Sequence, residues 1–324
     1  MHGIIRRVGL PLLAAVGMLA APAWAQDYPA RQIRIIVPFT AGGGTDLLAR
    51  LLSVRFYEAF GQTAVVDNRP GAGGNLGAEM VFRSTPDGYT LLMSTASLTV
   101  NVTLYPKMPF DARRDLIPIT QVASAPIVLT IHPSVPARSV RELIELSKRT
   151  KGGLNFGSNG SGTTSHLAGV MLEQVGGLRF THVPYKGAAA AIGALLAGEV
   201  EMGLPAVISA RPQIERGKLR GLAVTTMRKS SALPDLPTLD SMYPGFDIDN
   251  WFSLFAPAGT PPVVINRIHT EVVKALKHPD MIGFMQREGA EPVGSSPAEF
   301  AAFFNREIEK YAKIVKASGA KPDQ

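Results

Sequence analysis

Short apolar runs alternate with longer amphipathic segments along most of the chain, and this pattern predicts βα units around largely parallel sheets. Residues 33–37 are apolar and predict a buried strand, and residues 38–44 form a Gly-rich turn. Residues 45–60 then carry apolar side chains at helical spacing, which predicts a helix with one buried face. A second strand is predicted at residues 63–67, again followed by a Gly-rich turn.

Two helix starts in the later part of the chain are marked by capping boxes, Ser139–Glu142 and Ser296–Glu299. In such a box the Ser side chain and the Glu three residues later satisfy backbone donors at the helix start. Between the two boxes, residues 154–157 predict a strand. This strand leads into a segment rich in Ser, Thr and Gly, residues 158–164, and then into a helix. The chain therefore has Gly-rich strand-to-helix turns in both halves.

Two extended apolar stretches, residues 125–131 and 248–256, enclose a middle segment of α/β pattern, and the tail from Pro261 onward is predicted to be all helix. A helical tail has no sheet of its own, so we expect it to pack on the first domain. The chain of 324 residues is long enough for two domains and should cross between them twice. The predicted domains are residues 26–125 with 252–324 for the first and 126–251 for the second.

The start of the chain has the plan of a secretory signal peptide. Arg6 and Arg7 precede an uncharged apolar run, residues 8–19, and Ala23-Trp24-Ala25 supplies small residues at the expected cleavage site. A membrane anchor is the alternative, but the run is shorter than the roughly 20 residues that span a bilayer. We expect cleavage after Ala25 and export to the periplasm. The chain has no cysteine, which excludes disulfides, a lipoprotein anchor and a thiol nucleophile.

Charge and motifs exclude several classes of function. The formal net charge of the full chain is +7, but Lys and Arg are scattered and often lie beside acids, so we predict no nucleic-acid partner. His166 and His182 lack the partners and spacing of a zinc site, so no metal is expected. The chain contains no G-x-S-x-G elbow, no phosphate-binding P-loop and no H-E-x-x-H motif. We predict that the protein is not an enzyme and needs no cofactor.

The two Gly-rich turns can bind an anion without a cationic side chain, because a helix N-terminus presents unpaired N–H groups and the positive end of the helix dipole. The alternative is that the glycines only close tight turns. Asp46 is expected to cap its helix or to hold the loop, with contact to a ligand ammonium or hydroxyl as the alternative. The candidate ligand-binding residues in the first turn are Phe39, Thr40, Ala41, Gly42, Gly43, Gly44, Thr45 and Asp46. Those in the second are Ser158, Asn159, Gly160, Ser161, Gly162, Thr163, Thr164 and, in the following helix, His166.

Over essentially the whole mature chain the sequence resembles the Bug (TctC-type) periplasmic receptors of tripartite tricarboxylate transporters. The matching segments include Ile35–Phe39 with Ala41–Asp46, Asn68–Gly74, Pro86–Leu92, Gly157–Gly162, His166–Ala168, His182–Gly187, Gly217–Arg220, Leu222–Thr225, Leu236–Thr238 and Ala256–Pro261. The resemblance implies a two-domain α/β periplasmic-binding-protein (Venus flytrap) fold with two interdomain crossovers and the C-terminal helical tail packed on domain 1. It also implies a small carboxylate as ligand: a di- or tricarboxylate, an acidic amino acid or an aromatic acid.

In the family the carboxylates are held mainly by backbone groups and waters of the first βα loop and its counterpart in the other domain. These loops correspond to residues 39–46 and 158–164 of this sequence. The resemblance further implies delivery to the membrane components of a tripartite tricarboxylate transporter, and we expect a monomer. A periplasmic enzyme with an acid/base residue such as His166, or a ligand-dependent sensor partner, are the alternatives.

Three positions depart from the pattern of the family. Val102 stands where Pro is common, and Tyr311 replaces a frequent Trp. We expect both to affect packing only. Ser253 stands where Gly is usual, near the predicted crossing, and is expected to alter the hinge or the pocket.

Overall fold

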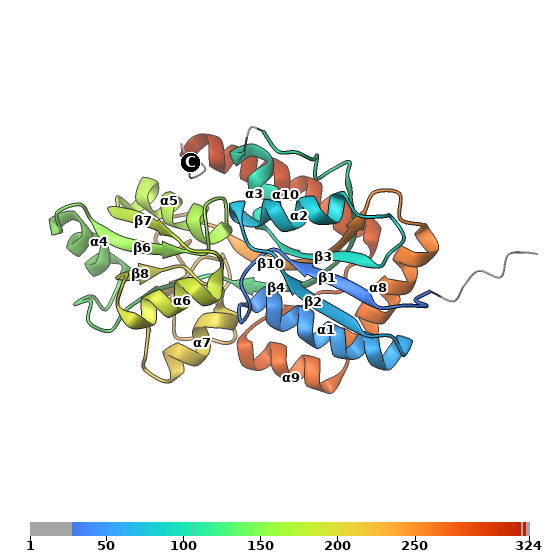
Figure 1. The fold of residues 1–324 in the computed structure, drawn as a ribbon. Helices are drawn as coiled ribbons and strands as arrows, with labels where there is room; N and C mark the ends of the chain where they lie inside the picture. Colours follow the sequence, from blue (N-terminus) through green and yellow to red (C-terminus); the bar gives the residue numbers. More distant parts are fainter. Residues whose placement is uncertain (1–27, 106, 319, 322–324) are drawn as a thin grey trace, which may run out of the picture.

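The computed structural model describes residues 28–105, 107–318 and 320–321. The predicted signal peptide, residues 1–25, therefore lies outside the described residues. The described chain forms two α/β lobes, each built around its own sheet and placed side by side (Figure 1).

The first lobe contains a six-stranded sheet in the order β11-β4-β10-β3-β1-β2. β1 pairs in parallel with β2 and β3, whereas β10 is antiparallel to β3 and β4. The strands are β1 (Ile33–Val37), β2 (Ala64–Asn68), β3 (Thr90–Thr95), β4 (Leu116–Pro126), β10 (Asp249–Pro257) and β11 (Glu291–Pro292). The helices of this lobe are α1 (Gly44–Phe60), α2 (Asn75–Phe82), α3 (Ser97–Leu104), α8 (Pro262–Leu276), α9 (Pro279–Glu288) and α10 (Pro297–Ser318), with a short 3₁₀ turn, η1 (Ala72–Gly74), before α2.

The second lobe contains a five-stranded sheet in the order β7-β6-β8-β5-β9. Its strands are β5 (Val128–Ile131), β6 (Leu154–Ser158), β7 (Phe180–Pro184), β8 (Met202–Gly203) and β9 (Arg220–Val224). Its helices are α4 (Val140–Arg149), α5 (Thr164–Gly176), α6 (Ala188–Ala197) and α7 (Val207–Glu215). The chain thus passes from the first sheet to the second after β4 and returns before β10.

Both faces of the first sheet are buried, and β1 shows why its sequence is apolar throughout. Ile33, Ile35 and Val37 belong to a core cluster shared with α1 and α8, whereas Ile36 belongs to the cluster on the other face, under α2, α3 and α10. A strand covered on both sides reads as a continuous apolar run. The strand predicted at residues 33–37 is confirmed as β1, and the helix predicted at residues 45–60 begins one residue earlier.

The capping boxes are formed, with one difference between them. In both, the Ser hydroxyl accepts a hydrogen bond from the Glu N–H three residues later. The Glu299 carboxylate in turn accepts a hydrogen bond from the Ser296 N–H at 2.9 Å. The Glu142 carboxylate instead accepts from the N–H of Arg138, one residue before the cap, at 2.7 Å.

The prediction that the tail from Pro261 onward is all helix is wrong at one place. β11 pairs with β4 at the edge of the first sheet, and the N–H groups of Val293 and Gly294 donate to carbonyls of β4. Pro292 and Gly294 cannot continue a helix without cost. The short segment therefore satisfies its backbone groups on the sheet edge before α10 begins.

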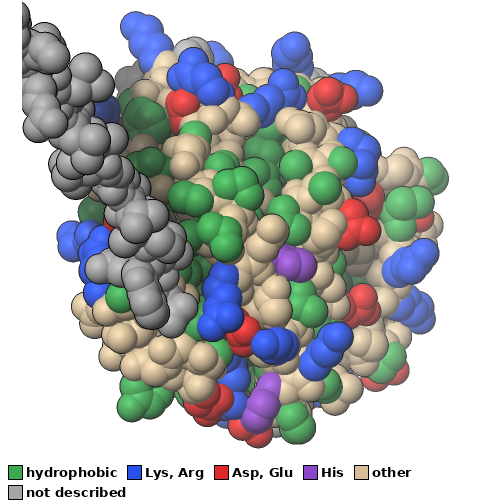
Figure 2. Space-filling model, turned by 90° about the vertical axis from the view of Figure 1, so that its right-hand side faces the viewer, with side chains coloured by type: hydrophobic (Ala, Val, Ile, Leu, Met, Phe, Trp, Pro, Cys, Tyr) green, Lys and Arg blue, Asp and Glu red, His purple; other side chains and the backbone are tan. Residues whose placement is uncertain are grey.

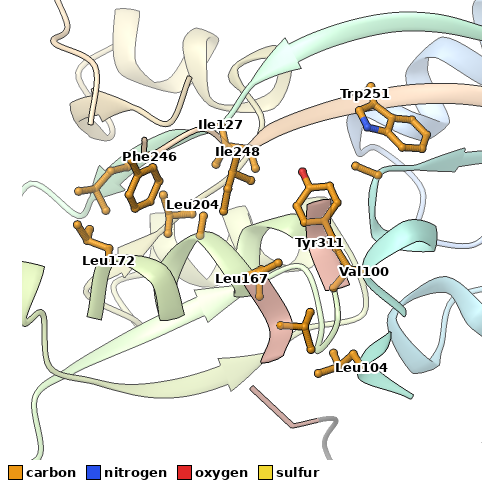
Figure 3. Packing of buried hydrophobic residues seen from close by; sticks show 14 of the residues in the cluster. Val100, Leu104, Ile127, Leu167, Leu172, Leu204, Phe246, Ile248, Trp251 and Tyr311 are labelled. Carbon is orange, nitrogen blue, oxygen red and sulfur yellow. The ribbon is translucent and has the colours of Figure 1, made fainter. Parts of the chain in front are cut away.

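Helix α10 packs on the first lobe, as predicted, and it also contacts α5 of the second lobe. Its Tyr311 is completely buried and lies in one cluster with Val100 and Leu104 of α3 and Leu167 of α5 (Figure 3). The Tyr311 hydroxyl donates to the backbone carbonyl of Asp249 at 3.2 Å. This position therefore has a packing role, and α10 connects both lobes close to the strands that cross between them.

The surface agrees with the charge pattern of the sequence. On the face shown in Figure 2, Lys and Arg side chains are spread among Asp and Glu side chains and form no continuous basic patch. None of the described helices is both long enough and apolar enough to cross a membrane.

Candidate ligand-binding site

A small pocket lies between the two lobes, where loops that follow β-strands of both sheets meet. This is the expected position of a ligand site in open α/β sheets, outside the carboxyl ends of the strands. The first lobe contributes Phe39, Thr40, Gly43, Gly44, Thr45, Thr95, Ser97, Asn250 and Phe252 to its lining. The second lobe contributes Asn159, Thr163, Thr164, Ala188, Ala206 and Ser209.

Five helices begin at this pocket. The lining includes first-turn or capping residues of α1, α3, α5, α6 and α7. In α5 the hydroxyl of the N-cap Thr163 accepts a backbone N–H of its own helix. In α3 the hydroxyl of Thr95, one residue before the cap, accepts the N–H of Ser97. The N-cap residues of α1, α6 and α7 make no such bond. The first N–H groups of a helix have no partner within the helix. The pocket therefore collects backbone donors and the positive ends of five helix dipoles.

The side chains of the lining are neutral. They supply hydroxyl and amide groups at the polar positions and the rings of Phe39 and Phe252 with two Ala methyl groups at the apolar ones. Two hydroxyl oxygens, Oγ1 of Thr40 and Oγ of Ser209, are buried and make no hydrogen bond with any described residue. One comes from each lobe. Buried hydroxyls normally find a partner, so this pair marks the pocket as a place for a polar ligand.

Gly44 is required where the two lobes approach each other. A Cβ atom at this position would lie 2.7 Å from Cγ2 of Ile208 in α7 and 3.1 Å from Cζ of Phe252. Real Cβ contacts essentially never fall below 3.0 Å, so a larger residue would displace the Ile208 side chain and press on the Phe252 ring. The glycine of this turn serves close approach of the lobes as well as the turn itself.

Asp46 holds the first loop and does not line the pocket. Its Oδ2 accepts hydrogen bonds from the Gly42 N–H and from Nε of Arg50, both at 2.9 Å. Its Oδ1 is buried and has no hydrogen-bond partner among the described residues. Burial acts to raise the pKa of the Asp46 carboxyl, but the bonds from Arg50, Gly42 and Asn68 outweigh it and hold that pKa below its usual value. The loop-holding role expected for Asp46 is thus the one that the structure supports.

Two histidines form hydrogen bonds with residues of the second loop. The rings of His166 and His182 stack with centroids 4.2 Å apart, and Nε2 of His182 lies 2.6 Å from the Ser158 hydroxyl. The Gly162 N–H donates to Nδ1 of His166 at 3.3 Å. Within the described part of the chain, no group of three or more His, Asp or Glu side chains could hold a metal ion. His166 therefore orders the loop by hydrogen bonding.

The lobes touch each other around the pocket. The Thr40 N–H donates to the carbonyl of Lys186 at 3.1 Å, and the Thr164 hydroxyl donates to Oδ1 of Asn250 at the same distance. The Tyr105 hydroxyl donates to the Ser161 carbonyl at 3.2 Å. The structure is therefore a closed arrangement, which no pattern in the sequence indicates.

The structure brings both predicted loops to the pocket but not every predicted residue. Eight of the candidates line it: Phe39, Thr40, Gly43, Gly44, Thr45, Asn159, Thr163 and Thr164. The others belong to the same loops or to the helix that follows, but they are not in the lining: Ala41, Gly42, Asp46, Ser158, Gly160, Ser161, Gly162 and His166. Ligand contact by any of these residues stays a prediction.

Sequence reasoning missed seven lining residues: Thr95, Ser97, Ala188, Ala206, Ser209, Asn250 and Phe252. A signal existed for Thr95 and Ser97: Thr95 ends strand β3 and Ser97 begins α3, so the two form a third hydroxyl-rich strand-to-helix turn. Asn250 lies in an apolar stretch that suggested only a crossing strand. Ser253 lies in β10, where it pairs with Ser94 of β3, and it is fully buried. It is not part of the lining, so an effect of this position on the hinge or the pocket stays a prediction.

Comparison with known proteins agrees with this architecture. The sequence profile described as "Tripartite tricarboxylate transporter family receptor", named TctC, matches residues 48–320. The chain belongs to the TctC family. Protein BugT of Bordetella pertussis is 35% identical over 319 residues, which cover 96% of this chain and 98% of BugT.

Solved TctC-like structures have the same fold. R. palustris Rpa4515 with adipate gives a TM-score of 0.88 at 35% identity and covers 92% of this chain and 100% of that chain. MatC from Rhodopseudomonas palustris with bound malate gives a TM-score of 0.85 at 28% identity, with coverage of 89% and 100%. The protein therefore has the two-domain Venus-flytrap fold of a TctC solute-binding protein, and it is a binding protein rather than an enzyme.

Proposed function

We propose that this TctC protein is a periplasmic receptor that captures a small organic carboxylate in the pocket between its lobes and delivers it to a tripartite tricarboxylate transporter. The observation that carries the proposal is the convergence of five helix N-termini on one pocket with neutral side chains. Such a site favours anions through oriented N–H groups and needs no cationic side chain. The adipate and malate bound to two structural relatives support the same ligand class.

The binding free energy that this site can supply is sufficient for a transport receptor. Hydrogen bonds to a charged group contribute about 1.5–3 kcal/mol each. Micromolar binding requires about 8 kcal/mol at a 1 M standard state, after the costs of ordering the ligand and closing the lobes. A few charge-assisted bonds from N–H groups and hydroxyls therefore suffice, with burial of the apolar part of the ligand against Phe39 and Phe252 as a further contribution.

The test is a thermal-shift screen of the mature protein against mono-, di- and tricarboxylates, followed by titration calorimetry of any hit. A ligand present at about 100 times its Kd should add about 2.7 kcal/mol to the free energy of unfolding. In parallel, native mass spectrometry of protein purified from the periplasm would identify an acid that is retained. No stabilisation by any carboxylate in the screen would contradict the proposal.

Thr40→Val tests the position of the site, because it removes a hydroxyl and keeps the shape of the side chain. We expect affinity for the hit to fall by about tenfold or more, the loss of one charge-assisted hydrogen bond. Thr270→Val is the matched control: Thr270 lies on α8, and its hydroxyl bonds only within that helix, to the Asn266 carbonyl. Equal affinities of the two variants would place the ligand elsewhere.

Export and organisation complete the proposal. We infer cleavage after Ala25, which intact-mass measurement of the periplasmic protein tests directly. The receptor would act as a monomer with domains at residues 26–125 with 252–324 and at 126–251. Because β4 ends at Pro126 and β10 begins at Asp249, the sheet of the first domain extends a few residues beyond these predicted boundaries. Its transporter partner would be identified by ligand-dependent co-purification with membrane components.

A further inference from the structure

We infer that a second cavity, beside the strands that cross between the lobes, binds a small organic ammonium ion, and that its occupation strengthens carboxylate binding. This hinge cavity is lined by residues of β4, β10 and α10, by Gly289 and Glu291, and by residues 226–231 with Asp247. Its volume is about 430 Å³, within the range of roughly 300–1,000 Å³ that is usual for small-molecule sites. The existence of this site does not depend on the proposed function, whereas its effect on carboxylate affinity does.

Strand β10 forms a wall of both the hinge cavity and the ligand pocket. Successive side chains of a strand point to opposite faces of its sheet. Asn250 and Phe252 line the ligand pocket, whereas Asp249 and Trp251 line the hinge cavity. The two described linings share no residue. The hinge cavity is therefore a separate site that contacts the ligand pocket through one strand.

Both lobes contribute to the hinge cavity. The first lobe supplies β4, β10 and α10, and the second supplies residues 226–231, which follow β9. A molecule that contacts both groups stabilises the relative position that the lobes have in this closed structure. A ligand that prefers the closed state raises the affinity of every other ligand that prefers it. Occupation of the hinge cavity should therefore favour capture of a carboxylate.

The partly shielded charge of the hinge cavity is negative. Its charged residues that are not exposed are three acids and one base: Asp247, Asp249, Glu307 and Lys310. The Lys310 Nζ lies 3.6 Å from Oδ2 of Asp247 and 3.5 Å from Oε1 of Glu307. The other charged residues of the lining are exposed to solvent: Arg228, Lys229 and Glu291. One ammonium group among three carboxylates leaves room for a second cation.

Asp249 is the lining residue that lacks a partner. One of its oxygens accepts from the Ser124 hydroxyl, whereas Oδ1 is buried and has no hydrogen-bond partner among the described residues. Buried polar atoms normally have a partner, and a buried carboxylate without a compensating charge is costly. Glu307, by contrast, accepts the indole N–H of Trp251 at 3.1 Å. A cation with N–H donors would satisfy Asp249.

An organic ammonium ion fits this cavity better than a metal ion. No group of three or more His, Asp or Glu side chains in the described part of the chain could hold a metal. An ammonium group needs only acceptors, because it carries three donors. The rings of Trp251 and Phe303, whose centroids lie 5.6 Å apart, belong to the lining. They supply apolar surface for a short alkyl chain.

The first measurement is calorimetric titration of n-butylammonium chloride into the mature protein at pH 7.5, where Asp249, with a pKa of about 6, is mostly ionised. 1-Butanol has the same alkyl chain without the charge, and sodium chloride controls for ionic strength. We expect n-butylammonium to bind with a Kd of about 1 mM or below and 1-butanol to bind at least about tenfold more weakly. No binding of the cation, or equal binding of the alcohol, overturns the proposal.

Two variants locate the site. Asp249→Asn and Glu307→Gln each remove one negative charge from the hinge cavity and keep an acceptor for Ser124 or Trp251. We expect Asp249→Asn to lower the affinity for n-butylammonium by about tenfold or more, the loss of one charge-assisted hydrogen bond, and Glu307→Gln to lower it by at least about threefold through charge alone. Asp235→Asn, at an exposed position outside the lining, is the control. Wild-type affinity in folded Asp249→Asn, or in Glu307→Gln should the first variant not fold, places the cation elsewhere and overturns the proposal.

The coupling is measured with the carboxylate that the thermal-shift screen identifies. Saturating n-butylammonium should lower its Kd by at least about fivefold relative to sodium chloride at equal ionic strength, and the carboxylate should raise the affinity for the cation by the same factor. A carboxylate Kd that the cation leaves unchanged or raises refutes the coupling, even where the cation binds. If no carboxylate binds, the proposed function fails, whereas titration of the cation alone still decides whether the site exists.

Discussion

Asp249 is a carboxylate that does not line the ligand pocket, and its position predicts that the stability of the protein depends on pH. It begins β10, where the chain returns to the first lobe. One oxygen accepts from the Ser124 hydroxyl, whereas Oδ1 is buried without a hydrogen-bond partner among the described residues. Burial is the main effect and raises the pKa of Asp249 to about 6, although Ser124 and Lys310 act in the opposite direction. Asp247 adds a smaller repulsion.

The sign and size of the effect follow from linkage. The folded-state pKa lies above the ordinary value of 3.8, so the folded protein holds this proton more tightly than the unfolded chain. The resulting stabilisation is complete below pH 3.8 and is lost as pH rises through about 6. At neutral pH the ionised carboxylate lowers the free energy of unfolding by up to about 3 kcal/mol relative to the protonated acid. When the pH is lowered from 7.5 to 5, protonation of Asp249 alone should raise the free energy of unfolding by about 1.4 kcal/mol.

The perturbation is Asp249→Asn, which keeps the shape and the acceptor for Ser124 but cannot ionise. We expect the variant to be more stable than wild type at pH 7.5, by about 1–3 kcal/mol, and the advantage to shrink on acidification to pH 5. The assay is urea unfolding of both proteins at several pH values. Asp235→Asn, at an exposed position, is the control and should leave the pH dependence unchanged. A variant that is less stable at pH 7.5, or that keeps the wild-type slope between pH 5 and 7.5, would refute the reasoning.

Two further predictions concern closure of the lobes. Gly44→Ala places a methyl group 2.7 Å from the Ile208 side chain of the opposite lobe. We therefore expect ligand affinity to fall by about tenfold or more, while the circular dichroism spectrum stays native. Unchanged affinity in calorimetry would show that the lobes do not need this close approach. Tyr105→Phe removes the hydrogen bond to the Ser161 carbonyl outside the pocket. We expect ligand affinity to fall by about two- to tenfold, mainly because the ligand dissociates faster in stopped-flow measurements. An effect confined to the association rate would contradict this role.

The parts of the fold that could be predicted from the sequence are those with a strong pattern in a short stretch of residues. A continuous apolar run such as residues 33–37 predicts a strand buried on both faces, and the structure covers β1 on both. A Ser-to-Glu capping box fixes a helix start to within a residue, as at Ser296. Family resemblance then supplied the two-lobed arrangement. Strand β11 was not predicted, because a two-residue strand has too little sequence pattern to be recognised. Its pairing also depends on the edge of β4, which is distant in sequence.

The site shows the same division between local and non-local information. Thr40 and Thr163 were found because each lies in a turn whose glycines and hydroxyls are contiguous in the sequence. Ser209 and Asn250 were missed because their roles depend on where α7 and β10 lie relative to those turns, which is decided by packing between elements distant in sequence. The chemistry of the pocket also differs from the sum of its loops. Each predicted loop contributes one helix N-terminus, whereas the assembled pocket collects five around neutral side chains, so the field that favours an anion there is larger than either loop can supply alone.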